Sequence, residues 1–139
     1  DGISFSIVKK LDNLEVGWIT GRRSESVETR AKHSGIKYLV MGELDKISAY
    51  RDIKIKSGLK NEEITYIGDD LVDIPVLKEA GLSICPLDAV EEVLKICDLK
   101  ADCIGGNGVF RFALKFILSS QNRWENIEKI FTNKKNIIK

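Results

Sequence analysis

The sequence IGDDLVDIP, from Ile67 to Pro75, decides the fold because three carboxylates follow an apolar run within it. The run from Ile64 to Ile67 is typical of a short buried strand, and Gly68 marks a sharp turn after that strand. Apolar residues at helical spacing resume at Val72 and continue to Ala80. The acids are therefore predicted at the carboxyl end of a strand, and they are Asp69, Asp70 and Asp73.

Two interpretations fit this acidic turn. In an open parallel sheet, ligands bind at the carboxyl edge of the strands. Clustered carboxylates repel one another unless a cation neutralises them, and hard oxygen ligands of this kind suit Mg²⁺. The alternative is that the aspartates cap the following helix, because Asp is favoured at helix starts and stabilises the N-terminal dipole. The turn by itself leaves both interpretations open.

Length and composition predict a single soluble globular domain. The chain has 139 residues, 43% of them hydrophobic and 31% charged, and we expect one domain over 1–139 with a frayed tail at 133–139. The 22 basic and 21 acidic residues give a net charge of +1, which argues against nucleic acid or an anionic membrane as a partner. No signal peptide or run of 18 apolar residues appears, so a cytoplasmic protein is expected.

The cysteines do not indicate a metal site. Cys85, Cys97 and Cys103 are an odd number without metal-ligand spacing. Their surroundings in or beside apolar runs are typical of small buried hydrophobic residues in a reducing compartment.

Strands and helices are predicted to alternate along the chain. Strands are expected at 15–20, 37–41, 64–67, 82–86 and 101–104, and helices at 2–11, 24–34, 45–57, 72–80, 89–97 and over most of the chain from 109. Ser24 and Asp45 are candidate N-caps, and Gly35 and Gly58 are helix stops. This order predicts an α/β fold of three layers, a Rossmann-like parallel sheet with helices on both faces.

Such a sheet should gather several polar side chains at one edge. Thr20 and Arg22 follow one strand, Lys46 follows the next, and the acidic turn follows a third. A hydroxyl, a lysine and a magnesium-competent acid group are together what a phosphoryl group requires. Separately, each has a simpler explanation: Lys46 as a solvated surface cation and Thr20 as a strand-end hydroxyl with a local hydrogen bond.

These motifs resemble those of the haloacid dehalogenase superfamily of phosphotransferases, in the order Thr20, Lys46 and GDDLVD from Gly68. Within the superfamily the chain is similar to the capless 3-deoxy-D-manno-octulosonate 8-phosphate phosphatase family, and related 9-phosphate sugar-acid phosphatases share much of the pattern. The stretches that carry this resemblance are ITGRRSESVETRA from Ile19, GELDKISAY from Gly42, YIGDDLVDIPVLKEAGLS from Tyr66 and GGNGVFR from Gly105.

The resemblance implies a magnesium-dependent phosphatase acting on a phosphorylated sugar acid, as in lipopolysaccharide biosynthesis. It implies that Asp69 is the side-chain ligand of Mg²⁺ and that Thr20 and Lys46 hold the phosphoryl group. Asp70 and Asp73 are implied to act in catalysis by orienting the metal ligand and its neighbours. The implied substrate-binding residues are Asp1, Gly2, Arg22, Arg30 and Lys46. For Arg30 a solvated helix face is an equally good explanation.

One motif of the family is missing. The family uses two aspartates separated by one residue, the first as nucleophile and the second as general acid, and the sequence contains no Asp-x-Asp. The expectation is that the nucleophile strand and the hairpin after it precede the recorded residues, which leaves the middle of the sheet incomplete. The alternative is an inactive binding or oligomerisation module on the same fold, for example attached to a sugar-acid nucleotidyltransferase.

The resemblance also implies a homotetramer, because capless members of the family complete their active sites by tetramerisation. An apolar stripe on the C-terminal helical segment could serve a neighbouring subunit or pack into the core. It consists of Phe112, Phe116, Ile117, Trp124, Ile127 and Phe131.

Overall fold

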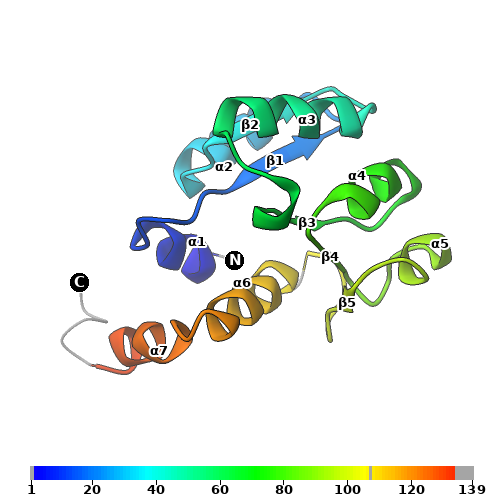
Figure 1. The fold of residues 1–139 in the computed structure, drawn as a ribbon. Helices are drawn as coiled ribbons and strands as arrows, with labels where there is room; N and C mark the ends of the chain where they lie inside the picture. The colour runs from blue at the N-terminus through cyan, green and yellow to red at the C-terminus, as the bar shows by residue number, and fades with distance from the viewer. Residues whose placement is uncertain (1, 107, 134–139) are drawn as a thin grey trace.

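The strand β4 (Leu82–Cys85) lies at the centre of a parallel sheet that helices cover on both faces. Its neighbours are β3 (Thr65–Ile67) and β5 (Leu99–Lys100), with Ile67 opposite Ile84 and Ile84 opposite Leu99. Successive residues of a strand point to opposite faces, and both Ile84 and Cys85 are fully buried. The computed structural model, shown in Figure 1, describes residues 2–106 and 108–133.

Different helices cover the two faces of this sheet. On one face Ile84 packs against α6 (Val109–Ser120). On the other face Cys85 packs with Leu77 of α4 (Ile74–Glu79) and Val93 of α5 (Glu91–Leu94). The predicted three-layer α/β class with helices on both faces of a parallel sheet is confirmed.

A second parallel sheet contains β1 (Gly17–Thr20) and β2 (Tyr38–Met41), paired from Gly17 opposite Tyr38 to Thr20 opposite Met41. The crossover helix α2 (Glu25–Ser34) ends at Gly35, whose φ of 72° is a left-handed conformation that glycine adopts without strain. After β2 the chain enters α3 (Lys46–Ser57), which is capped by Asp45. Both the stop at Gly35 and the cap at Asp45 agree with the sequence prediction.

Three helices form a separate part of the core. In Figure 1, α1 (Gly2–Lys9) lies beside α6, and α7 (Trp124–Thr132) continues from the end of α6. Their buried residues form one cluster: Ile7, Val8, Leu114, Leu118 and Ile127. The predicted C-terminal helical segment is therefore two helices, which separate at Asn122 with a φ of 57°.

Two local predictions were wrong. The last strand is β5 at Leu99–Lys100 and not 101–104, because the pairing with β4 loses its regular register after Ala101. The Leu87 N–H donates to the carbonyl of Cys103 at 3.0 Å, whereas a regular parallel ladder would use the carbonyl of Ala101. Ser24 occupies the N-cap position of α2 but makes no capping hydrogen bond, since its hydroxyl pairs with that of Ser26 at 2.7 Å. Asp1, Asn107 and the predicted frayed tail from 134 lie outside the described residues. Within the described ranges no helix is both long and apolar enough to span a bilayer.

Candidate functional site

The buried carboxylate of Asp73 is the centre of the turn that follows β3. Its Oδ1 accepts hydrogen bonds from the Tyr66 hydroxyl at 2.7 Å and from Lys46 Nζ at 2.9 Å. Its Oδ2 accepts from the backbone N–H groups of Asp69 at 3.0 Å and Asp70 at 3.1 Å. Asp73 is only 3% exposed, and a buried charge is stable only when it is paired and hydrogen-bonded. These donors make Asp73 the structural anchor of the turn.

Gly68 allows this anchor to approach the backbone. A Cβ atom at Gly68 would lie 2.6 Å from Cβ of Asp73, which is closer than real Cβ contacts come. The Gly68 N–H also donates to the carbonyl of Ile84 at 3.1 Å, so the end of β3 is held to β4. The glycine after the strand is therefore required by close packing of Asp73.

The carboxylates of Asp73 and Asp69 have pKa values shifted in opposite directions. Burial raises the pKa of Asp73, but the hydrogen bonds from Lys46 and Tyr66 outweigh burial and hold this pKa below its usual range. The pKa of Asp69 is raised by burial and then by the charges of Asp73 and Asp70, which Lys46 only partly offsets. A cation bound at Asp69 would relieve this repulsion.

The acidic turn combines both interpretations of the sequence. Asp70 Oδ1 accepts from the Leu71 N–H at 2.7 Å, and the turn Leu71–Asp73 is a single 3-10 helix before α4. The prediction of a helix cap therefore applies to Asp70, which caps this 3-10 helix. Asp73 is occupied by protein donors, which leaves Asp69 as the carboxylate of this turn that is best suited to a cation.

Lys46 is fixed by the start of a helix. It is the first residue of α3, directly after the cap Asp45, whose Oδ1 accepts from the Ser48 N–H at 3.3 Å. The side chain of Lys46 is 15% exposed and that of its partner Asp73 is 4% exposed. The alternative that Lys46 is a solvated surface cation is therefore wrong.

Thr20 lies at the end of β1, and its Oγ1 accepts from the Arg22 N–H at 3.2 Å. This local hydrogen bond matches the simpler explanation of Thr20, although the same residue also lines a cavity with Lys46, Asp69 and Asp73. The structure thus brings together three predicted positions from separate strand ends.

Other predicted substrate contacts lie elsewhere. Arg22 and Arg30 are exposed and do not line that cavity. The guanidinium of Arg30 lies over the ring of Trp18 at 5.8 Å, on the side of α2. Gly2 begins α1, and Asp1 is outside the described residues. Roles for these four residues in substrate binding remain predictions.

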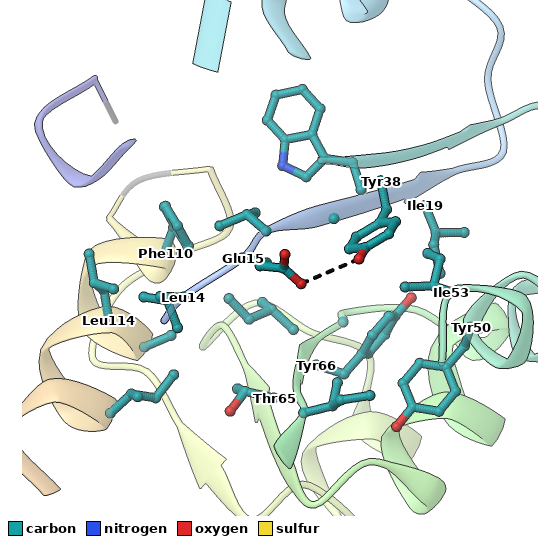
Figure 2. Close-up of a pocket in the computed structure, with 18 of the residues that line it drawn as sticks. Leu14, Glu15, Ile19, Tyr38, Tyr50, Ile53, Thr65, Tyr66, Phe110 and Leu114 are labelled. Atoms are coloured by element: carbon teal, nitrogen blue, oxygen red, sulfur yellow. Dashed lines mark hydrogen bonds between the residues drawn. The ribbon is translucent and has the colours of Figure 1, made fainter. Parts of the chain in front are cut away.

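The cavity, of about 1160 Å³, lies between β1 and β3. Figure 2 shows Ile19 from β1, Thr65 and Tyr66 from β3, and further apolar side chains from α3 and α6 around it. Within the described ranges, β1 pairs only with β2 and β3 pairs only with β4. The parallel sheet is therefore in two parts, and each part presents a strand edge to the cavity.

Sequence reasoning missed two residues that bear on Asp69. Tyr66 is hidden in an apolar run, and nothing in that run indicates where its hydroxyl points. Asp88 follows β4, accepts from the Gly105 N–H at 2.7 Å and contributes to the raised pKa of Asp69. The strand-end rule that selected Thr20 and the acidic turn could have found Asp88 as well.

Residues 7–112 match the sequence profile of the haloacid dehalogenase-like hydrolases. The chain belongs to this family. Among curated relatives of this chain, the 3-deoxy-D-manno-octulosonate 8-phosphate phosphatase of Salmonella typhi is 35% identical over 111 residues, which cover 80% of the chain and 59% of the relative. The chain thus spans about three fifths of the length of that relative.

Two solved structures resemble this chain closely. One is the 3-deoxy-D-manno-octulosonate 8-phosphate phosphatase of Moraxella catarrhalis in complex with magnesium, phosphate and KDO, with a TM-score of 0.89, 32% identity, and coverage of 94% of this chain and 74% of that one. The other is the cobalt-bound deoxy-D-mannose-octulosonate 8-phosphate phosphatase of Haemophilus influenzae, with a TM-score of 0.87, 30% identity, and coverage of 99% and 78%.

The donor set around Asp69 fits a magnesium ion held mainly by other ligands. No group of three or more His, Cys, Asp or Glu side chains in the described part of the chain could hold a metal. Mg²⁺ usually keeps several waters and binds through one or two carboxylates together with substrate phosphate oxygens. A single carboxylate at a strand end, in the same cavity as the ammonium of Lys46, meets that pattern.

Proposed function

We propose that this hydrolase is a magnesium-dependent phosphatase that hydrolyses the phosphate monoester of a 3-deoxy-sugar acid, with 3-deoxy-D-manno-octulosonate 8-phosphate as the substrate. The observation that carries the proposal is the buried Lys46–Asp73 ion pair in the same cavity as Thr20 and Asp69. The names of the relatives and the ligands of the Moraxella structure support the choice of substrate and metal.

Each residue of the site has a role in this proposal. The Thr20 hydroxyl and the Lys46 ammonium bind phosphoryl oxygens, and Asp69 holds Mg²⁺. When bound, the metal shields the charge that develops on the transferring phosphoryl group. Asp73 positions Lys46 and the backbone of Asp69, and Asp70 fixes the turn by capping it.

The nucleophile in this proposal is an aspartate on a strand that occupies the cavity between β1 and β3. The 139 residues contain no Asp-x-Asp, while the two facing strand edges and the apolar lining would accept one more strand. Its carboxylate attacks phosphorus, and the sugar alcohol leaves with a proton from the second aspartate. Water then cleaves the acyl phosphate to release inorganic phosphate.

The proposal includes assembly as a homotetramer. Four exposed apolar side chains stand on the loops that follow strands β2 to β5, on the side where the candidate site lies. They are Leu44 (69% exposed), Leu71 (55%), Leu87 (54%) and Ile104 (53%). Exposed apolar residues around a polar site favour contact with another protein surface. Sedimentation equilibrium tests this part: a monomer at micromolar concentration would contradict it.

Isothermal titration calorimetry tests the site itself. Mg²⁺ should bind to the wild-type chain, and Asp69→Asn should weaken its affinity by about tenfold or more because the ligand charge is lost. Asp52→Asn is the matched control, since Asp52 is exposed on α3 and the same charge is removed away from Asp69, and it should keep the affinity. In the presence of Mg²⁺, 3-deoxy-D-manno-octulosonate 8-phosphate should bind more tightly than the unphosphorylated sugar acid. An equal affinity for both would argue against a phosphate site.

A phosphate-release assay tests the chemistry. The chain alone should release no phosphate, whereas addition of a synthetic peptide with six apolar residues followed by Asp-x-Asp should restore turnover. A peptide with Asn at the first aspartate is the control and should be inactive. Substrate binding without turnover under all conditions would favour the inactive binding module instead.

A further inference from the structure

Building on the proposed function, we infer that the Tyr66 hydroxyl is a positioning group for the phosphate-binding lysine. It holds Asp73 Oδ1 in place, and through that oxygen it sets the position of the Lys46 ammonium. Tyr66 and Lys46 donate to the same oxygen, at 2.7 Å and 2.9 Å. In the proposed function, metal and phosphate are bound by Thr20, Lys46 and Asp69, whereas Tyr66 acts through the side chains of Asp73 and Lys46.

The packing of the Tyr66 ring is well suited to keep its hydroxyl group at one position beside Asp73 Oδ1. It belongs to β3 and packs against two core clusters, one around Leu77 and Cys85 and the other around Tyr50 and Val76. The ring of Tyr50 meets it edge-on, with centroids 6.3 Å apart and an interplanar angle of 86°. A packed aromatic ring has little rotational freedom, so its hydroxyl has one available position.

The bond between Lys46 and Asp73 does not by itself fix the position of Asp73 Oδ1. The ammonium of lysine sits at the end of a flexible four-carbon chain with three donor hydrogens. The backbone N–H groups of Asp69 and Asp70 hold Oδ2 of Asp73, so with Lys46 as the only donor to Oδ1 the carboxylate could still pivot about Oδ2 and carry the ammonium with it. With Tyr66 also bound to Oδ1, the oxygen is held from the side of β3, and Lys46 needs only one of its three hydrogens to reach it. The remaining hydrogens are available to a phosphoryl group.

A pair of tyrosine variants tests this inference. Tyr66→Phe keeps the ring and its packing but removes the hydroxyl from Asp73. Tyr50→Phe is the matched control, because it removes a buried hydroxyl that donates to Asn61 Oδ1 at 2.8 Å, away from Asp73. Calorimetry gives the affinities for Mg²⁺ and, in its presence, for orthovanadate. The rate at which acetic anhydride acetylates Lys46, followed by mass spectrometry, gives a readout that needs no ligand.

The positioning role predicts a specific split between these readouts. Tyr66→Phe should weaken vanadate affinity about fivefold, the effect of losing one hydrogen bond to a charged network, and should change the Lys46 acetylation rate. Mg²⁺ affinity should stay within about twofold, because Asp69 is still held through Oδ2 of Asp73. Tyr50→Phe should match the wild type in all three.

The outcomes that overturn the inference are separate from those that overturn the proposed function. Unchanged vanadate affinity and acetylation in Tyr66→Phe, or equal changes in Tyr50→Phe, would reduce Tyr66 to a packing residue. A wild-type chain that binds neither Mg²⁺ nor vanadate would overturn the proposed function, and the positioning role with it.

Discussion

At the scale of single residues, the candidate site contains two aspartates of the same turn whose surroundings shift their pKa values in opposite directions. Asp73 is surrounded by donors and has a lowered pKa, while Asp69 is crowded by acids and has a raised pKa. Asp73 is therefore an anion with a structural role, whereas a cation beside Asp69 would relieve the repulsion from its acidic neighbours. Both residues are aspartates, so the difference between their pKa values comes from the direction in which each side chain points.

The charge of Asp73 predicts a pH dependence of stability. A carboxyl with a lowered pKa in the folded state contributes stability above its unfolded pKa, about 3.9, and loses it as the pH falls through the folded value. Asp73→Asn should lower the free energy of unfolding by about 3 kcal/mol at pH 7, because a buried pair is broken. The difference from wild type should shrink below about pH 4.

Urea denaturation between pH 7 and pH 3 measures this difference. Asp52→Asn on the exposed side of α3 is the control and should follow the wild type at every pH. A constant gap between wild type and Asp73→Asn down to pH 3 would mean that Asp73 carries no stabilising charge.

The sequence could predict which residue types meet at the site but not how they pair. Thr20, Lys46 and Asp69 were found from strand ends, and the structure places them around one cavity. The bond between Tyr66 and Asp73 was not foreseeable, since the direction of a side chain inside a buried strand depends on tertiary packing. The same holds for Arg30, whose guanidinium lies over the ring of Trp18 and does not line the cavity, while its role in substrate binding stays a prediction.

At the scale of elements, the start of α3 delivers Lys46 to the site. Asp45 accepts hydrogen bonds from both the N–H and the hydroxyl of Ser48, at 3.3 Å and 2.8 Å, and Lys46 is the next residue. Helix stops at glycine and this cap could be predicted because they depend on local backbone chemistry. The extent of β5 could not, because it depends on the register in which the chain after Lys100 meets the chain after β4.

Removal of the cap should destabilise α3. Asp45→Ala should lower the free energy of unfolding by about 1 kcal/mol, the usual effect of losing an N-cap. Ser24→Ala at the start of α2 is a matched control, because Ser24 occupies the N-cap position without making a capping hydrogen bond. This substitution should lower the free energy of unfolding much less. Thermal denaturation of both variants measures the difference, and equal losses would mean that capping is not what holds α3.

At the scale of the whole molecule, the order of strands and helices was predictable and the closure of the sheet was not. Alternation of strands and helices fixes a parallel α/β class. Whether neighbouring strands touch depends on what lies between them, and here a cavity separates β1 from β3. The absence of Asp-x-Asp leads to the expectation that the middle of the sheet is incomplete, and this stays a prediction. In the part of the chain that the structure describes, the strands form a two-stranded and a three-stranded sheet.

This division predicts unequal local stability, which amide hydrogen exchange can measure. The amides of β4 should exchange slowest, because β4 is paired on both edges and Ile84 and Cys85 are fully buried. The amides of β1 and β3 should exchange faster, since each strand has an edge on the cavity and its residues are at most partly buried.

Addition of the apolar Asp-x-Asp peptide should then slow exchange in β1 and β3 while β4 changes little, because a strand that enters the cavity would bond to both edges. The same peptide with proline at its centre is the control, since proline cannot donate to the ladder and should give weaker protection. If β1 already exchanges as slowly as β4 without peptide, the two half-sheets are equally stable and need no further strand. Protection of only one of the two strands would place the peptide on a single edge, and the cavity would then not be the seat of a strand that joins the sheet.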